Sequence, residues 1–172
     1  NLQIDCLSCL LNVASCRADI ILISKAFFSF DLCLIKKNIG QSLANIGKLY
    51  TEMGDFSKGT EYLTRSLVIR EKLGDTYGIG SVLGTLGVFH QTKGNYVKAL
   101  DYHNRSLTIC ESLSDKRGIA IQLMNIGGIY NIKGEHAKSV EYLEKSLSIF
   151  KEIELNERDM ILINTANLYL SY

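Results

Sequence analysis

Residues 36–155 read KKNIGQSLANIGKLYTEMGDFSKGTEYLTRSLVIREKLGD (36–75), TYGIGSVLGTLGVFHQTKGNYVKALDYHNRSLTICESLSD (76–115) and KRGIAIQLMNIGGIYNIKGEHAKSVEYLEKSLSIFKEIEL (116–155). The three blocks align without a gap, each forty residues long. Nine columns are identical in all three, and in the first block these are Ile39, Leu43, Gly47, Gly54, Lys58, Tyr62, Ser66, Leu67 and Ile69. Such a fixed period is the signature of a repeat architecture, in which neighbouring units stack to bury a shared core.

Each block is predicted to contain two amphipathic helices. Apolar residues recur three and four positions apart in the first half, as at Ile39, Leu43 and Ile46, and again in the second half. This spacing is that of one helix face. Gly54 followed by Asp55 separates the halves, and predicts a residue with positive φ that ends one helix and a polar cap that begins the next. The expected fold class is therefore all-α, a solenoid of antiparallel helix pairs.

The same frame divides the chain into five segments. Residues 1–35 keep none of the invariant columns, and we expect a degenerate helix pair there. Repeats follow at 36–75, 76–115 and 116–155, and residues 156–172 resemble the first helix of a fourth repeat. The chain stops inside that helix, and it begins without Met, which favours an excerpt of a longer protein, although processing would give the same start.

A glycine recurs inside the first helix of every block, although glycine costs about 1 kcal/mol relative to alanine in a helix interior. In the first block it is Gly47. A position without Cβ lets a second helix approach closely. We expect Ser66 and its counterparts opposite this glycine, with Leu67 and its counterparts filling the contact between the helices.

Composition excludes several classes of partner. The 172 residues are 47% hydrophobic and 22% charged with a formal net charge of +1, which is globular and provides no basic surface for nucleic acid. Residues 20–35 are apolar, but Lys25 and Asp31 interrupt them, and a membrane span needs about twenty residues. We therefore expect neither a nucleic acid nor a membrane as partner.

Cysteine usage argues against a metal site or a disulfide framework. Four of the five cysteines, Cys6, Cys9, Cys16 and Cys33, lie near the start, and Cys110 lies far downstream. Cys6 and Cys9 form a single C-x-x-C without a second pair, so neither zinc nor another cofactor is expected. Because no secretory signal precedes them, the sequence favours reduced thiols and a cytoplasmic location.

Residues 45–67, NIGKLYTEMGDFSKGTEYLTRSL, resemble the tetratricopeptide repeat signature L-G-x-x-Y-x-x-x-G-x-Y-x-x-A-x-x-x-Y-x-x-A. The forty-residue period departs from the thirty-four of the commonest members, and the proline that usually ends the second helix is absent. The chain is similar to a forty-residue subtype. The resemblance implies a right-handed superhelix whose first helices line a concave groove, which commonly holds an extended peptide or a helix of another protein.

The family's groove positions carry over to thirteen residues of this chain. They are Gln41, Asn45, Lys48 and Thr51 in the first block, Ser81, Thr85, Val88 and Gln91 in the second, Ile121, Asn125 and Asn131 in the third, and Asn164 and Asn167 in the last helix.

Four of these positions, Asn45, Thr85, Asn125 and Asn164, form a row of mostly amide side chains. An amide both donates to and accepts from a peptide backbone, so the row could hold main chain with little regard to side chain. The alternative is that these residues only tie neighbouring helices together. Because Lys48 is the single basic residue of the set, we expect a neutral groove without a clamp for carboxylates.

The histidines do not form a catalytic arrangement. His90, His103 and His136 occupy aromatic or turn positions of the repeat, without carboxylates at the spacing of a triad or a metal site, so packing is the expected role. The recurring Lys58, with its counterparts in the other blocks, is expected on a solvated convex face. The chain is therefore predicted not to be an enzyme.

The leading functional hypothesis is a scaffold that binds a peptide or helix of a partner protein in the groove. An alternative is a peptide-sensing regulatory module that controls an effector domain outside this segment. Self-association is a third, because apolar residues of the last helix, such as Ile161 and Leu168, lack a covering helix.

Overall fold

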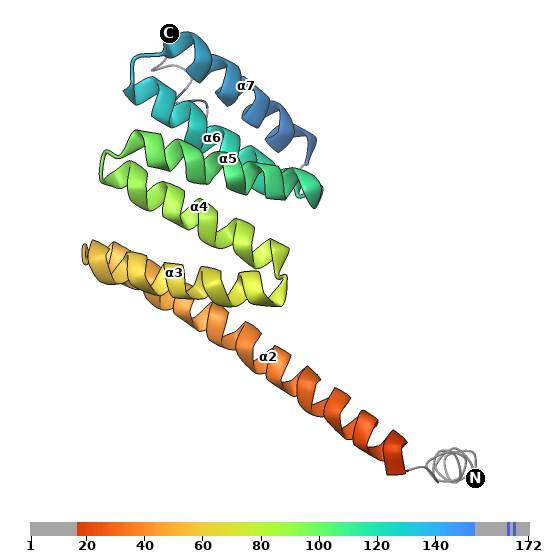
Figure 1. Ribbon diagram of the computed structural model, residues 1–172. Helices are drawn as coiled ribbons and strands as arrows, with labels where there is room; N and C mark the ends of the chain where they lie inside the picture. Colours follow the sequence, from red (N-terminus) through yellow and green to blue (C-terminus); the bar gives the residue numbers. More distant parts are fainter. Residues whose placement is uncertain (1–16, 154–164, 166, 168–172) are drawn as a thin grey trace.

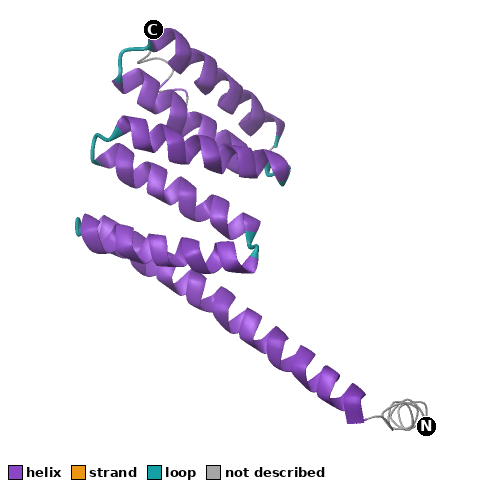
Figure 2. Cartoon of the chain, in the orientation of Figure 1, coloured by secondary structure: helices purple, strands orange, loops and turns teal. Residues whose placement is uncertain are grey.

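The computed structural model describes residues 17–153, 165 and 167. All regular structure in this part is helical (Figure 2). The helices are α2 (Arg17–Glu52), α3 (Phe56–Leu73), α4 (Thr76–Thr92), α5 (Tyr96–Ser112), α6 (Lys116–Ile132) and α7 (His136–Glu152). They pack as consecutive antiparallel pairs, α2 with α3, α4 with α5 and α6 with α7, and the pairs stack in chain order (Figure 1). The predicted all-α architecture of helix pairs is confirmed.

Helix α2 is 36 residues long, about twice the length of any other described helix. Its N-terminal part extends beyond the stack (Figure 1). The expected boundary between residues 35 and 36 is not a break, because the helix runs straight through it. Leu34 and Ile35 stand where Gly74 and Asp75 end one helix and begin the next, so the residues that stop a helix are missing. The rest of the pair expected at 1–35 lies in residues 1–16, outside the described part.

The junctions between helices carry the predicted signals. Gly74, with φ of 65°, ends α3, and Ser114, with φ of 54°, takes the same left-handed conformation after α5. The carboxylates of Asp75 and Asp115 then accept hydrogen bonds from backbone N–H groups three residues on, at 3.0 and 2.9 Å. These bonds cap the N-termini of α4 and α6. The sharp reversals between helices follow from this chemistry.

A buried hydrogen bond joins the two helices of each pair. In all three repeats the hydroxyl of a serine on the second helix donates to a carbonyl oxygen on the first helix, and the serines are at most 1% exposed. The pairs are Ser66 with Gly40 at 2.7 Å, Ser106 with Gly80 at 2.9 Å and Ser146 with Ala120 at 2.7 Å. The recurring serine therefore fixes the register between the helices.

The recurring glycine lies at a second close approach within each pair. A Cβ on Gly47 or Gly127 would lie 2.8 Å from Cγ of Leu63 or Leu143, which is closer than real Cβ atoms come. The expectation that serines face these glycines is wrong. Fully buried side chains, Leu63, His103 and Leu143, lie there instead, and Leu67 is only half-buried. The antiparallel order of the helices places the serines further along, at the carbonyl positions described above.

Replacing Ser146 with alanine tests the buried hydroxyl. The substitution removes its bond to the Ala120 carbonyl, and we expect the free energy of unfolding to fall by about 1 kcal/mol in urea denaturation. Ser148→Ala is the matched control, because Ser148 is exposed on the same helix. We expect it to change stability by less than about 0.5 kcal/mol. Equal effects of the two substitutions would contradict the role given to the recurring serine.

Adjacent glycines of α6 allow a similarly matched test of the close approach. Gly127→Ala places a methyl group against Leu143 and should destabilise the protein by about 1–3 kcal/mol. At Gly128 the nearest atom to a new Cβ is 4.0 Å away, so Gly128→Ala should stabilise by about 0.5–1 kcal/mol through helix propensity. Thermal or urea denaturation measures both. A stabilising Gly127→Ala would show that the helices do not need glycine there.

Candidate functional site

One groove runs across the first helices of the three repeats, α2, α4 and α6. Its volume is about 470 Å³. Seven of the thirteen predicted groove residues line it: Lys48, Thr51, Ser81, Thr85, Val88, Ile121 and Asn125. Because the first helix of each pair faces the same side of the stack, residues forty positions apart meet in a single surface.

The groove is also lined by four residues that sequence reasoning did not select: Glu52, Gly84, Phe89 and Gln122. Gly84, Phe89 and Gln122 are buried, so they form the floor rather than the rim. Helical periodicity assigns such positions to the core and gives no sign that they also border a groove. Glu52 lies one helical turn after Lys48 and brings a carboxylate to the same wall. The charged lining residues are thus one of each sign.

Gln41 and Asn45 belong to a network that ties helices together. The Gln41 amide donates to Oδ1 of Asn45 at 3.0 Å, and its Oε1 accepts from Nη2 of Arg70 at 2.7 Å. Arg70 is only 4% exposed and its Nη1 lies 2.6 Å from Oδ2 of Asp75. Sequence reasoning missed this arginine, because its position in the repeat holds Cys110 and Phe150 in the other blocks.

Gln91 and Asn131 are predicted groove residues that do not line this groove. The Gln91 amide lies beside Gly128 of the next repeat, and a Cβ added to Gly128 would lie 4.0 Å from Gln91 Nε2. Asn131 Oδ1 lies 3.2 Å from Nδ1 of His136 at the α6–α7 turn. Asn167 is helical and half-buried, whereas Asn164 lies outside the described residues.

The predicted amide row is only partly assembled in the described part of the chain. Thr85 and Asn125 line the groove, but the Thr85 hydroxyl donates to the Ser81 carbonyl of its own helix at 3.0 Å. Asn45 is joined to Gln41 as described. Asn125 is therefore the amide of this row that lies in the groove itself.

The histidines pack within the repeats. The His90 ring stacks on Tyr102 with ring centroids 5.2 Å apart, as Tyr50 stacks on Tyr62 and Tyr130 on Tyr142 in the other repeats, both at 5.5 Å. Two of the recurring lysines lie over these tyrosines, Lys58 at 5.2 Å from the Tyr50 ring and Lys138 at 5.2 Å from the Tyr130 ring. The recurring lysines 58 and 138 thus have a packing role beside the aromatic pair.

His103 and Gln122 form a buried polar contact between the second and third repeats. Nδ1 of His103 donates to Oε1 of Gln122 at 2.8 Å, and His103 is fully buried. Among the described residues, Nε2 of His103 has no hydrogen-bond partner. Burial lowers the pKa of His103 below its ordinary value of 6.5, because the interior penalises the charged ring.

Within the described helices, no group of three or more His, Cys, Asp or Glu side chains could hold a metal ion. The described helices also contain no stretch with the length and apolarity that crossing a bilayer requires. Cys33 is exposed and Cys110 buried, both as free thiols, while Cys6, Cys9 and Cys16 lie outside the described residues.

The depressed pKa of His103 gives stability a predictable pH dependence. In the unfolded chain His103 takes up a proton near pH 6.5, whereas in the folded chain it does so only at lower pH. The contribution of the neutral His103 to the free energy of unfolding is therefore complete above pH 6.5 and is lost as the pH falls below it. We expect the free energy of unfolding to fall as the pH drops below 6.5. Urea midpoints at several pH values measure the drop. The drop in the free energy of unfolding should be smaller in His103→Leu. The remaining drop comes from His90, because burial lowers the pKa of His90 as well. Identical drops in the parent and the variant would contradict the assignment to His103.

Two family models match the chain. Residues 38–112 match one model described as Tetratricopeptide repeat, and residues 123–152 match another with the same description. Neither is a family of enzymes. No curated protein matches the chain.

Among solved structures, the fold is similar to that of "BtubC (BKLC) from P. vanneervenii", with a TM-score of 0.69 and 18% sequence identity. The match covers 77% of this chain and 55% of that one, so the chain spans about half the length of that protein. At this identity the likeness concerns the fold alone. Over the matched residues, the chain belongs to the tetratricopeptide repeat family.

Proposed function

We propose that the groove across α2, α4 and α6 binds an extended peptide or a helix of a partner protein, and that the chain serves as a non-enzymatic interaction scaffold. Tetratricopeptide repeats are generally protein-interaction modules and are typically not catalytic. One observation carries the proposal. Three helices from three successive repeats contribute side chains to a single open groove.

The lining chemistry favours an amphipathic ligand. Val88 is 45% exposed and, with the half-buried Ile121, offers apolar contact area. Asn125 can both donate to and accept from a peptide main chain. Lys48 and Glu52 carry opposite charges, so binding should depend only weakly on salt.

The internal hydrogen bonds of each pair favour a preformed groove. The serine hydroxyls and the close contacts at the recurring glycines fix each first helix relative to its partner. A rigid surface loses little conformational entropy on binding, so a few contacts can suffice for affinity. This rigidity favours the scaffold over the regulatory module, which would have to change its shape on binding.

A screen of random peptides against the purified chain tests the proposal. Val88→Arg introduces a long charged side chain into the groove and should weaken selected peptides at least about tenfold. Val97→Arg is the matched control, because Val97 is 83% exposed on α5, outside the groove lining. The control should bind as the parent does, as measured by calorimetry. Equal affinity of both variants, with intact helical circular dichroism, would exclude the groove as the binding surface.

A further inference from the structure

The contact between the first and second repeats contains a buried guanidinium. Arg70 reaches from α3 across the junction, where Nη1 lies 2.6 Å from Oδ2 of Asp75 and Nη2 lies 2.7 Å from Oε1 of Gln41. Its Nε lies 3.3 Å from the Ser66 hydroxyl. The group covers Gly78, where a Cβ would meet Nη1. Arg70 thus fills the space between α2, α3 and α4.

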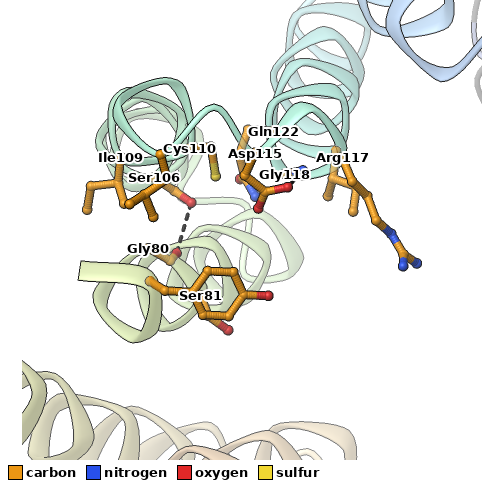
Figure 3. A pocket seen from close by; sticks show the side chains of 12 residues that line it. Gly80, Ser81, Ser106, Ile109, Cys110, Asp115, Arg117, Gly118 and Gln122 are labelled. Atoms are coloured by element: carbon orange, nitrogen blue, oxygen red, sulfur yellow. Dashed lines mark hydrogen bonds between the residues drawn. The ribbon is translucent and has the colours of Figure 1, made fainter. Parts of the chain in front are cut away.

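The contact between the second and third repeats has the corresponding aspartate and glycine but lacks the arginine. Forty residues on, the position of Arg70 is taken by Cys110, while Asp115 and Gly118 correspond to Asp75 and Gly78. The shorter side chain leaves a pocket of about 260 Å³. One water needs only about 10–15 Å³, so the space can admit a larger group. Figure 3 shows Ser106, Cys110 and Asp115 around it.

The groups that hold the Arg70 guanidinium recur in this pocket. Asp115 corresponds to Asp75, Ser106 to Ser66 and Ser81 to Gln41, and all three line the pocket. Oδ1 of Asp115 caps α6 by accepting from Gly118 N–H at 2.9 Å. In the described part of the chain, Asp115 has no ion pair. Its second oxygen, the counterpart of the one that binds Arg70, faces the pocket beside Gly118 and Cys110.

We propose that this pocket binds a guanidinium group, the side chain of an arginine supplied by the peptide in the groove. The proposal deepens the proposed function and rests on it for the source of the arginine. Asp115 provides the charge-assisted acceptor, and the hydroxyls of Ser106 and Ser81 accept the remaining N–H groups.

The pocket borders the groove. Ser81, Ile121 and Gln122 line both the pocket and the groove, so the two spaces are neighbours. At the rim, Tyr77 is 69% exposed and Leu113 is 43% exposed. A peptide lying across α4 and α6 can therefore direct one side chain down to Asp115.

The other titratable groups of the pocket permit a cation. Burial, followed by the charge of Asp115, raises the pKa of the Cys110 thiol, which is therefore neutral at pH 7. Arg117 also lines the pocket, but in Figure 3 its guanidinium points away from Asp115. Tyr77 contributes a phenol hydroxyl at the rim. The carboxylate of Asp115 is thus the negative charge of the pocket lining.

Small probes test the pocket without the rest of a peptide. N-acetylarginine amide is titrated into the ¹⁵N-labelled chain, and N-acetylcitrulline amide serves as a neutral probe of nearly the same shape. We expect the arginine probe to shift the amide resonances of Ser106 and Gly118 with a Kd on the order of 1 mM. We expect the citrulline probe to bind at least about tenfold more weakly.

Two variants separate the pocket from general charge effects. Asp115→Asn keeps a side chain that caps α6 but removes the carboxylate, and should weaken the arginine probe at least about tenfold. Cys110→Arg supplies the guanidinium from within, as Arg70 does, and should abolish binding. Asp55→Asn changes a capping carboxylate on α3, outside the pocket lining, and should leave binding unchanged.

The outcomes distinguish this proposal from the groove proposal. Three outcomes would each overturn the arginine pocket. They are unchanged binding of the arginine probe to Asp115→Asn, equal binding of the citrulline and arginine probes, and no resonance shift up to about 20 mM arginine probe, which is well above the expected Kd. In that case, library peptides that still lose affinity in Val88→Arg would leave the groove function standing. Enrichment of arginine at one position of the selected peptides, together with loss of that enrichment in Asp115→Asn, would support both the groove and the arginine pocket.

Discussion

The structure depends on a buried serine hydroxyl that joins the two helices of each pair at 2.7–2.9 Å. The hydroxyl donates to a carbonyl oxygen that is already part of a helix, so its position fixes both the register and the spacing of the facing helix. The glycine two turns away then allows the close contact with Leu63, His103 or Leu143. With both contacts repeated, the pairs become equivalent units and their first helices line one groove.

Equivalence of the units makes their differences informative. One position of the repeat holds Arg70, Cys110 and Phe150. Arg70 and Phe150 are almost completely buried and occupy their own space, whereas Cys110 leaves a pocket above Asp115. A solenoid can thus keep one backbone frame and place a binding pocket at a single junction through one shorter side chain. In this chain the varying column opens the space, while Ser106 and Asp115, which match Ser66 and Asp75, supply the proposed acceptors.

Sequence reasoning identified much of the fold because local chemistry determines it. The helices follow from apolar spacing and the turns from residues such as Gly74 and Asp115. The partner of the recurring serine could not be inferred, since the relative register of two helices is a tertiary property. For the same reason Gln41 was assigned to the groove, although it holds Arg70. The pocket at Cys110 arises because its side chain is smaller than those of Arg70 and Phe150 at the same repeat position. A sequence motif gives no sign of such an unfilled space.

A crystal structure of the Cys110→Arg variant would show whether positions forty residues apart are physically equivalent. The new guanidinium should lie over Gly118 and pair with Asp115 and Ser106, in the arrangement that Arg70 makes with Asp75 and Ser66. The backbone of α5 and α6 should remain unchanged. A new side chain that turns to solvent, or helices that move apart to admit it, would contradict the equivalence of the two junctions.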